Sequence, residues 1–533
     1  MRTVVIPCAG TGSRLGDLTR FYNKAMLTLG PKPIISYIIE HFTKDDEIII
    51  LLGYKGDFLR QVIQALYPGW NIIFREVDIF EGPGSGLGYS LSRAEDLLQK
   101  PFIFWPNDTL VSNDVNIFPD CDWVMTGRRE QESKNYRHVL IDFGKGCTIL
   151  PKQAVGYYNT YPYTGICHIH NYEKFWEAYH NNPQQFIEEG EVVGINNIPE
   201  VADYPASNWI DTGNRKIFES VREKYNEQME EVILEKPDEA IWFIDNRVVK
   251  FHIDPKFISD RVKRFDTFLS VGQKASWIKI PELLYYSKNV YVYKREPGII
   301  ASRCIDVNSF KMLLENFFHY QESCNLDLEA KLKIYENFYH KKTVDRIKKF
   351  CKDRSKRDIS CTINGLDCIP ALKAVEKINW EKIAKKAEFT PNYHGDFHLE
   401  NILVQEHEFV MLDWRQNFGS SEVGDVYYDY AKMWHSLIVN HNIVRNELFE
   451  VIEDDKISIN IYRPFIDTEL EEILKNYIDR ETYNVKQAEL ITALVFLNIA
   501  ACHVGEYSVF LFYLGKYLIN KVMLKYPELF IGD

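Results

Sequence analysis

The first hundred residues constrain the fold most, because apolar segments alternate there with amphipathic ones. Apolar segments with the length of strands occupy residues 2–7, 47–54, 71–77 and 101–108. Segments with helical spacing occupy residues 34–42, 56–67 and 86–98. Strands that are apolar on both faces and alternate with helices are typical of a parallel sheet covered by helices on both sides. We therefore expect an α/β fold for this part of the chain.

The chain of 533 residues is too long for a single hydrophobic core, and two domains are expected. A charged helical stretch at 217–236 has the character of a linker. The next segment, at 239–254, predicts a hairpin, because two β-rich runs flank Asp245 and Asn246. From about Val307 the pattern becomes helical. We place the two domains at 1–225 and 226–533.

Composition and charge narrow the classes of function. The net charge of -13 and the pI of about 5.6 argue against a nucleic-acid-binding surface. The ten cysteines form no C-x-x-C pair, which argues against a zinc or dithiol motif. The start of the chain turns Gly-rich too soon for a signal peptide, and no run reaches the about 18 apolar residues of a membrane span. We expect a cytoplasmic protein without membrane insertion.

A first polar constellation follows the strands of the N-terminal part. The Gly-rich loop 9–14 lies between a strand and a helix, where backbone N–H groups can bind a phosphate. Lys24 follows it, Asp108 ends an apolar strand, and Asp211 lies on a turn in "NWIDTGN". Two carboxylates with a lysine and a glycine loop predict a Mg²⁺–triphosphate site. Taken singly, Asp211 is better explained as a turn residue or helix N-cap, and Lys24 is explained equally well as a solvated helix lysine.

This pattern resembles the nucleotidyltransferases that make sugar nucleotides and CDP-alcohols. The resemblance implies a Rossmann-like domain with a mixed, mostly parallel sheet. It also implies catalytic roles for Arg14 and Lys24, and Mg²⁺ binding by Asp108 and Asp211. The residues implied to bind the NTP phosphates are Ala9, Gly10, Thr11, Gly12 and Ser13.

Two further segments carry the same resemblance. Gly84 and Gly86, in "GPGSGLGYSL", match the loop that binds the base and ribose. Thr164 and Gly165, in "YPYTGICHI", match the substrate-binding strand. The chain departs from the family pattern with Asn23 in place of a proline and Asn107 in place of a glycine, and neither change removes a charged group.

A second constellation lies in "HGDFHLENIL" and the strand that follows it. Asp396 and Asn401 are five residues apart, and Asp413 ends the next strand. Phosphoryl transfer to a hydroxyl needs an acid for the hydroxyl proton and oxygen ligands for Mg²⁺. We therefore expect Asp396 to be catalytic and Asn401 and Asp413 to bind metal. A zinc site on His394 and His398 is the alternative, but it lacks a third ligand.

These residues resemble the aminoglycoside phosphotransferase and choline kinase superfamily. The resemblance implies a bilobal, protein-kinase-like α+β domain with an N-lobe at about 230–300 and a C-lobe at about 301–533. It implies that Lys250 binds the ATP phosphates. The expected glutamate partner is missing from the next segment, where Asp260 is the candidate, and Asp425 is expected to cap the following helix.

The two resemblances together predict a bifunctional enzyme. The kinase would phosphorylate a small hydroxyl compound with ATP, and the transferase would join the product to a nucleotide from CTP, UTP or dTTP, with Mg²⁺ at both sites. An NDP-sugar or NDP-polyol for surface glycan synthesis is the first hypothesis. The alternative is a choline or ethanolamine kinase with a cytidylyltransferase, in which Trp434 and the Tyr-rich segment at 156–165 form an aromatic cage. The sequence leaves the acceptor, the base and the oligomeric state open.

A pseudoenzyme and a protein kinase are alternatives from other classes. A degenerate binding protein would not be expected to keep its charged residues, and Lys24, Asp108, Asp396 and Asp413 are all present. A kinase acting on proteins would be expected to have an Ala-Pro-Glu signature, which the sequence lacks.

Overall fold

The computed structural model of the chain forms two compact units. It describes all residues except 113–119, 128–134, 143, 145, 152–157, 207, 228, 230–237, 275–276, 320, 407, 420, 482 and 532–533. Unit 1 consists of Met1–Glu231, Pro237–Ile253 and Tyr285–Val292. Unit 2 consists of Val232–Lys236, Asp254–Leu284 and Tyr293–Asp533.

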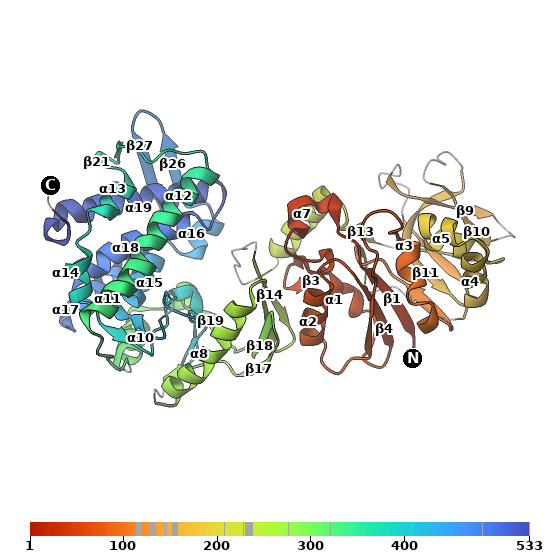
Figure 1. The fold of residues 1–533 in the computed structure, drawn as a ribbon, viewed down its shortest axis with the longest axis horizontal. Coiled ribbons are helices and arrows are strands. Elements are labelled where there is room, and N and C mark those ends of the chain that lie inside the picture. The colour runs from red at the N-terminus through yellow and green to blue at the C-terminus, as the bar shows by residue number, and fades with distance from the viewer. Residues whose placement is uncertain are drawn as a thin grey trace. The chain divides into compact units, whose positions relative to one another are not determined.

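Unit 1 is built on a mixed sheet whose central strands are parallel (Figure 1). These strands lie in the order β5 (Ile72–Glu76), β4 (Glu47–Leu52), β1 (Thr3–Cys8) and β6 (Phe102–Phe104). The strands beyond β6 are β11 (Thr160–Ile169), β8 (Trp123–Thr126), β12 (Ala202–Pro205), β9 (His138–Asp142) and β10 (Gly146–Ile149). The chain reverses its direction of winding between β1 and β6, where ligands bind in open α/β sheets. The predicted α/β fold is confirmed.

Helices cover the sheet and enclose two apolar cores. The helices are α1 (Ile34–Ile39), α2 (Gly56–Leu66), α3 (Leu87–Ser92), α4 (Tyr172–Asn181), α5 (Pro183–Glu189), α6 (Glu191–Asn196) and α7 (Arg215–Glu227). Successive side chains of a strand point to opposite faces. Val4 and Ile6 of β1 therefore lie in one core, and Val5 and Ala9 lie in the other. This arrangement explains why the strands are apolar throughout.

The predicted hairpin at 239–254 is present as β14 (Glu239–Ile244) and β15 (Arg247–His252). It forms a sheet with β18 (Val290–Lys294) and β17 (Leu283–Tyr286). Trp242 Nε1 donates to Thr28 Oγ1 over 3.0 Å, and Arg247 Nη2 donates to the carbonyl oxygen of Leu66 over 2.9 Å. The hairpin thus packs within unit 1, and the domain boundary after residue 225 stays a prediction.

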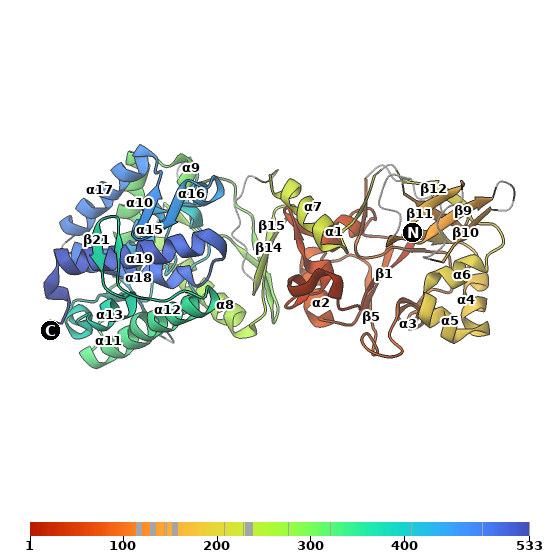
Figure 2. The ribbon, with the colours of Figure 1, turned by 90° about the horizontal axis from the view of Figure 1, so that it is seen from above.

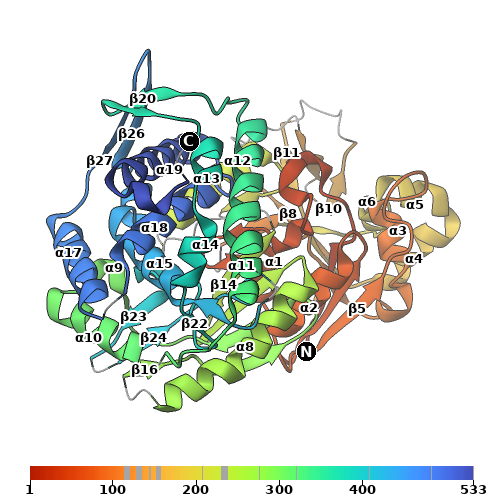
Figure 3. The ribbon, with the colours of Figure 1, turned by 60° about the vertical axis from the view of Figure 1, so that its left-hand side comes forward.

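Unit 2 contains a small sheet that carries the second polar constellation (Figure 3). The sheet has the order β16 (Ile278–Lys279), β24 (Phe409–Met411), β23 (Ile402–Val404) and β19 (Ile299–Ile300). Of the strands outside it, β22 (Phe389–Thr390) pairs with β25 (Gly424–Asp425). The longer helices are α8 (Pro255–Lys274), α10 (Val307–His319), α11 (Leu328–Tyr335), α12 (Lys342–Asp353), α15 (Val426–Ile438), α17 (Phe465–Arg480), α18 (Val485–Ala500) and α19 (Gly505–Lys525). The shorter ones are α9 (Ala301–Cys304), α13 (Ala371–Glu376), α14 (Trp380–Lys385) and α16 (His441–Arg445).

The helical core of unit 2 depends on the close packing of α18 against α19 (Figure 2). A Cβ atom on Gly515 of α19 would lie 2.8 Å from the backbone nitrogen of Leu497, so the glycine allows the two helices to approach. The helical pattern predicted from Val307 onward is interrupted by a sheet of four short strands. These are β21 (Leu366–Cys368), β20 (Cys361–Ile363), β27 (Ile457–Ile461) and β26 (Phe449–Glu453). Strands of three to five residues give too short a pattern for sequence periodicity to identify.

In the part of the chain that the structure describes, every helix is too short or too polar to cross a bilayer.

The contact between α3 and α5 gives a test of the fold of unit 1. A Cβ atom on Gly88 would lie 1.8 Å from the carbonyl oxygen of Phe186. We expect Gly88→Ala to lower the free energy of unfolding by about 1–3 kcal/mol, because the backbone must move to admit the methyl group. Chemical denaturation measures the change. Gly10→Ala is the control, since a Cβ there meets nothing within 4 Å, and equal stability of the two variants would contradict the described packing.

Candidate active sites

The Gly-rich loop lies directly after β1, at the switch point of the unit 1 sheet. Gly12 has a φ of 69°, and a Cβ atom there would lie 2.9 Å from Thr19 Cγ2 and 3.2 Å from Lys24 Cβ. Gly10 is exposed and has open space around it. The loop therefore packs against Lys24 at Gly12 and leaves room for a ligand at Gly10.

Asn23 fixes the backbone that carries Lys24. Its Nδ2 donates to the carbonyl oxygens of Cys8 and Tyr54 over 2.7 and 2.8 Å, and its Oδ1 accepts from Ala25 N over 3.0 Å. Asn23 is fully buried. Asn23, which stands where the family pattern has a proline, thus holds this backbone by hydrogen bonds and not by a rigid ring.

Lys24 and Arg14 both approach the carboxylate of Asp108. Lys24 Nζ lies 2.8 Å from Asp108 Oδ2, and Arg14 Nη2 lies 3.6 Å from the same atom. Burial alone would raise the pKa of Asp108, but the charge and hydrogen bond of Lys24 outweigh it, so the pKa lies below its usual value. Asp108 is therefore ionised at neutral pH.

Asp211 lies beside Asp108, although the two are far apart in sequence. β13 (Trp209–Asp211) pairs with β7 (Thr109–Val111), and Thr212 N donates to the carbonyl oxygen of Asp108 over 2.8 Å. A Cβ atom on Gly213 would lie 2.5 Å from Asp108 Oδ2 and 3.0 Å from Asp211 Oδ1, so both carboxylates face this glycine. Burial and then the charge of Asp108 raise the pKa of Asp211. A divalent cation between the two carboxylates would relieve this repulsion.

Sequence reasoning missed Tyr136, whose hydroxyl donates to Asp211 Oδ2 over 3.1 Å. Tyr136 belongs to no motif, and only the folded chain brings it to the site.

Of four further residues predicted for unit 1, Gly86, Thr164 and Gly165 have structural roles, and Gly84 lies in open space. A Cβ atom on Gly86 would lie 2.5 Å from the carbonyl oxygen of Ile187, whereas one on Gly84 would meet nothing within 4 Å. Thr164 Oγ1 donates to the carbonyl oxygen of Met125 over 3.1 Å. A Cβ atom on Gly165 (φ 92°) would lie 2.6 Å from a side-chain carbon of Pro106. Contacts of these four residues with ligands stay predictions.

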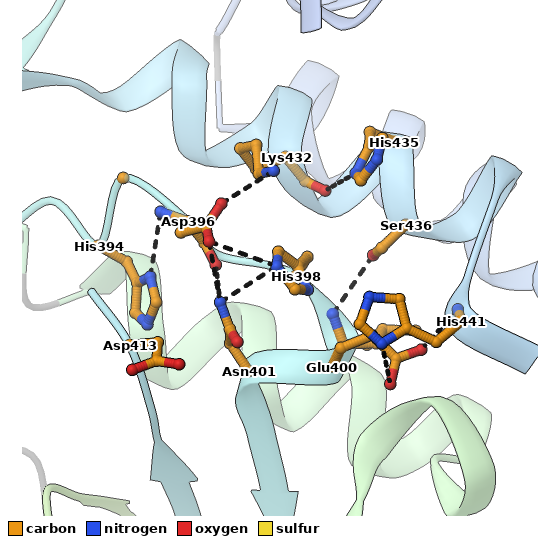
Figure 4. A network of polar contacts seen from close by, with 12 residues as sticks. His394, Asp396, His398, Glu400, Asn401, Asp413, Lys432, His435, Ser436 and His441 are labelled. Atoms are coloured by element: carbon orange, nitrogen blue, oxygen red, sulfur yellow. Dashed lines mark hydrogen bonds and ion pairs between the residues drawn. The ribbon is translucent and has the colours of Figure 1, made fainter. Parts of the chain in front are cut away.

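The second constellation is brought together in unit 2 by the hairpin of β23 and β24 (Figure 4). Asn401 precedes β23, and Asp413 lies two residues after β24. Leu412 N donates to the carbonyl oxygen of Asn401 over 2.8 Å, which keeps the start of β23 next to the end of β24. Asp413 has a φ of 57°, a left-handed conformation that is uncommon for a residue with a side chain. Such strain is found most often at functional sites.

Asp396 lies at the centre of the network in Figure 4. Its carboxylate accepts from Asn401 Nδ2 over 3.2 Å, and it lies 2.8 Å from Lys432 Nζ and 3.5 Å from His398 Nε2. Burial raises the pKa of Asp396, but the charge of Lys432 and the contact with His398 lower it well below its usual value. Lys432 is buried, and sequence reasoning did not assign it a role.

Buried groups hold the 394–401 loop in place behind Asp396. Asp429 accepts from the backbone nitrogens of His394 and Gly395 over 2.8 and 2.5 Å. Asp396 N donates to His394 Nδ1 over 3.2 Å. His394 is fully buried, and burial lowers its pKa to about 3, so its ring is neutral and can accept this hydrogen bond.

The residues predicted for the kinase N-lobe divide between the two units. Lys250 lies on β15 of unit 1, opposite Ile241. Asp260 lies on α8 of unit 2, where its Oδ2 is 2.5 Å from Lys256 Nζ and accepts from Asn417 over 3.3 Å. The role of Lys250 and its pairing with an acid stay predictions.

Two other side chains of unit 2 are placed clearly. Arg261 of α8 lies 3.4 Å from Asp413 Oδ1, a contact that no motif indicated. Asp425 accepts from Tyr427 N over 3.0 Å at the start of α15, so the predicted helix cap is confirmed.

Within the described ranges, no group of three or more His, Cys, Asp or Glu side chains could hold a metal ion alone. Mg²⁺ commonly takes one or two protein carboxylates together with substrate phosphates and water. The donors at both sites are carboxylate and amide oxygens, which fit this ion, and Mg²⁺ binding stays a proposal.

Comparisons with known proteins agree with both constellations. Residues 370–453 match the family model described as "Phosphotransferase enzyme family". The family match includes Asp396, Asn401 and Asp413 but does not reach Lys250.

The N-terminal part matches sugar-nucleotide nucleotidyltransferases. It is 26% identical over 140 residues to the bifunctional protein GlmU of Methanocaldococcus jannaschii, covering 26% of this chain and 32% of that protein. It is 25% identical over 175 residues to the UTP–glucose-1-phosphate uridylyltransferase of Staphylococcus haemolyticus, covering 27% of this chain and 59% of that protein. This chain thus spans about a third and about three-fifths of these relatives.

A solved structure of a putative glucose-1-phosphate thymidylyltransferase from Bacillus anthracis, in complex with a sucrose, is also similar. It is 19% identical with a TM-score of 0.36, and the match covers 44% of this chain and 98% of that one.

The buried neutral state of His394 gives a pH prediction. The unfolded chain binds a proton at this histidine below about pH 6.5, whereas the folded chain does so only near pH 3. Stability should therefore fall as the pH is lowered through this window. His394→Asn should make the fall shallower, as measured by denaturant unfolding at several pH values. His180→Asn, at an exposed histidine, is the control, and an unchanged slope in His394→Asn would contradict the burial of a neutral ring.

Proposed function

We propose that the protein is a bifunctional enzyme that phosphorylates a small hydroxyl compound and then joins the product to a nucleotide. The observation that carries the proposal is the presence of two separate charged sites, one in each unit. Unit 1 gathers Lys24, Asp108 and Asp211 at the switch point of its sheet. Unit 2 gathers Asp396 and Asn401 on the loop that leads into the β23–β24 hairpin.

In the kinase reaction, the acceptor hydroxyl attacks the γ-phosphorus of ATP and ADP leaves. Asp396 is ionised and bonded to Asn401 and Lys432, which suits a group that orients the hydroxyl and accepts its proton. Mg²⁺ bound by Asn401 and Asp413 would neutralise the charge of the phosphates.

In the transferase reaction, the new phosphate attacks the α-phosphorus of an NTP and pyrophosphate leaves. Lys24 and Arg14 converge on Asp108 and supply the positive charge that this step requires. The loop at Gly10 has the space to admit the phosphates. Asp108 and Asp211 would hold Mg²⁺ between them.

An NDP-sugar or NDP-polyol is the product that we propose, with surface glycan synthesis as its use. The alternative with a choline-type acceptor requires an aromatic cage. Trp434 is 3% exposed and donates through Nε1 to Glu471 over 3.1 Å, which is the environment of a core residue. Part of the Tyr-rich segment lies outside the described residues, and Tyr158 is 92% exposed.

Substitution of one carboxylate in each unit tests the proposal. Asp396→Asn should lower ADP formation by at least about 100-fold, because the hydroxyl loses the group that accepts its proton. It should leave pyrophosphate release from a supplied sugar phosphate unchanged. Asp108→Asn should lower pyrophosphate release and leave ADP formation unchanged. Asp353→Asn, at an exposed carboxylate of α12, is the control, and loss of both activities in either variant would contradict two independent sites.

The metal requirement of unit 1 can be tested separately. Asp211→Asn should raise the Mg²⁺ concentration for half-maximal pyrophosphate release by about tenfold or more, because one carboxylate ligand is removed. Titration of Mg²⁺ at fixed NTP measures this. Asp17→Asn is the matched control, since Asp17 is 84% exposed. An unchanged Mg²⁺ requirement would exclude Asp211 as a ligand.

A further inference from the structure

Four cationic side chains gather beside the catalytic loop of unit 2, and three of them have no part in the reaction proposed above. We call Lys342, Arg346, Arg415 and Lys432 the basic cluster. Lys342 and Arg346 lie one turn apart on α12. Arg415 follows Asp413 after β24, and Lys432 lies on α15. Three segments that are distant in sequence therefore contribute to it.

Lys342 and Arg415 meet over the same two aromatic rings. Lys342 Nζ lies 4.2 Å from the ring centre of Phe338 and 5.9 Å from that of Tyr428. Arg415 Cζ lies 5.0 and 6.0 Å from the same two centres. The rings hold both cations by cation–π attraction and so fix the positions of the two charges relative to each other.

The basic cluster adjoins the proposed catalytic carboxylate. Lys432 Nζ lies 2.8 Å from Asp396 Oδ1, and Tyr428 lies one turn before Lys432 on α15. Arg415 N donates to the carbonyl oxygen of His394 over 2.7 Å. A Cβ atom on Gly395 (φ 74°) would lie 2.6 Å from Arg415 Cβ, so this glycine lets Arg415 lie against the catalytic loop.

The charge of the basic cluster is largely uncompensated. Of the ion pairs between described residues, one joins Lys432 to Asp396, and none includes Lys342, Arg346 or Arg415. Arg346 Nη1 lies 2.9 Å from the sulfur of Cys502, and Arg415 Nε is buried without a hydrogen-bond partner among the described residues. Burial, and then the charges of Arg415 and Arg346, lower the pKa of Lys342 well below its usual value. Cations kept together at this cost are expected to bind an anion.

We propose that the basic cluster binds an anionic group, a carboxylate or a phosphate, on the hydroxyl compound that the kinase phosphorylates. This inference rests on the proposed kinase function and names the class of its acceptor. The guanidinium of Arg415 offers paired N–H donors to a carboxylate or phosphate, and Lys342 supplies a further N–H donor, whose protonation a bound anion would favour. Lys432 connects this subsite to Asp396, which accepts the proton of the acceptor hydroxyl.

The reaction balances with such an acceptor. The hydroxyl oxygen forms a bond to the γ-phosphorus of ATP, the bond from this phosphorus to the β,γ-bridging oxygen breaks, and the hydroxyl proton leaves toward Asp396. The products are ADP and a phosphoester that still carries its original anionic group. A quaternary ammonium acceptor would be repelled by the positive charge of the same cluster.

Matched acceptors test the proposal. ADP release should be measured with glycerol, glycerate and glycerol 3-phosphate, with glucose, glucuronate and glucose 6-phosphate, and with choline and ethanolamine. We expect kcat/KM to be at least about tenfold higher for an acidic acceptor than for its neutral counterpart, because a charge-assisted hydrogen bond is gained. Preference for a neutral or a cationic acceptor would overturn the inference and leave the kinase function standing.

Variants of the basic cluster show whether it binds the acceptor or ATP. Arg415→Gln and Lys342→Met should each raise the KM for the acidic acceptor by about tenfold or more and leave the KM for ATP within about twofold. Arg415→Lys should recover part of the loss, because the charge is kept. Lys349→Gln, on the same helix but paired with Asp353, is the control. A rise in the KM for ATP alone would assign the cluster to ATP and overturn the proposal.

Direct binding distinguishes failure of this inference from failure of the kinase function. Glycerol 3-phosphate and glycerol should be titrated by calorimetry into the full chain and into Arg415→Gln. Binding of glycerol 3-phosphate that is lost in the variant supports the anion subsite even where no acceptor yields ADP, and that combination would contradict only the kinase function. Equal binding to the two proteins would overturn the subsite, because the variant leaves unit 1 unchanged.

Discussion

Two lysine–carboxylate contacts, each 2.8 Å long, set the charge state of both proposed sites. In each case a partly buried aspartate stays ionised because an ammonium group lies beside it, and its pKa falls below its usual value. The lysine comes from another segment of the fold: Lys24 follows the Gly-rich loop, and Lys432 lies on α15. Because removal of either partner leaves a charge without its counterion, the surrounding backbone must hold both side chains in place.

The backbone around each site meets this requirement by different means. In unit 1 the site lies where the chain reverses its direction of winding, between β1 and β6. Asn23 fixes the backbone before Lys24 with three hydrogen bonds. In unit 2 the buried carboxylate of Asp429 accepts from two backbone nitrogens of the catalytic loop. Burial raises the pKa of Asp429 to about 7, so these two hydrogen bonds strengthen as the group ionises.

Sequence reasoning identified the residues that belong to short motifs and missed those that only the fold brings together. The strands and helices of residues 1–108 and the hairpin that begins at Glu239 follow from local pattern. The proximity of Asp108 and Asp211 is expected from the resemblance to nucleotidyltransferases. Tyr136, Arg261 and the basic cluster could not be found in this way, because each contacts its site across many residues. The four-stranded sheet within the helical part was not predicted, because its strands are too short to show the two-residue period of a strand.

Net charge was also a poor guide to local chemistry. The whole chain is acidic, with a net charge of -13, yet Lys432 pairs with Asp396 in unit 2, and Lys342 and Arg415 lie together over the ring of Phe338. Surface carboxylates separated from these cations by more than about 8 Å are screened by physiological salt. The proposed anionic acceptor would therefore meet a positive subsite whatever the sign of the total charge. Aromatic rings are present at this site, but Phe338 and Tyr428 already hold the cations of Lys342 and Arg415. Because these two rings already contact cations of the protein, they do not supply an aromatic cage for a quaternary ammonium group.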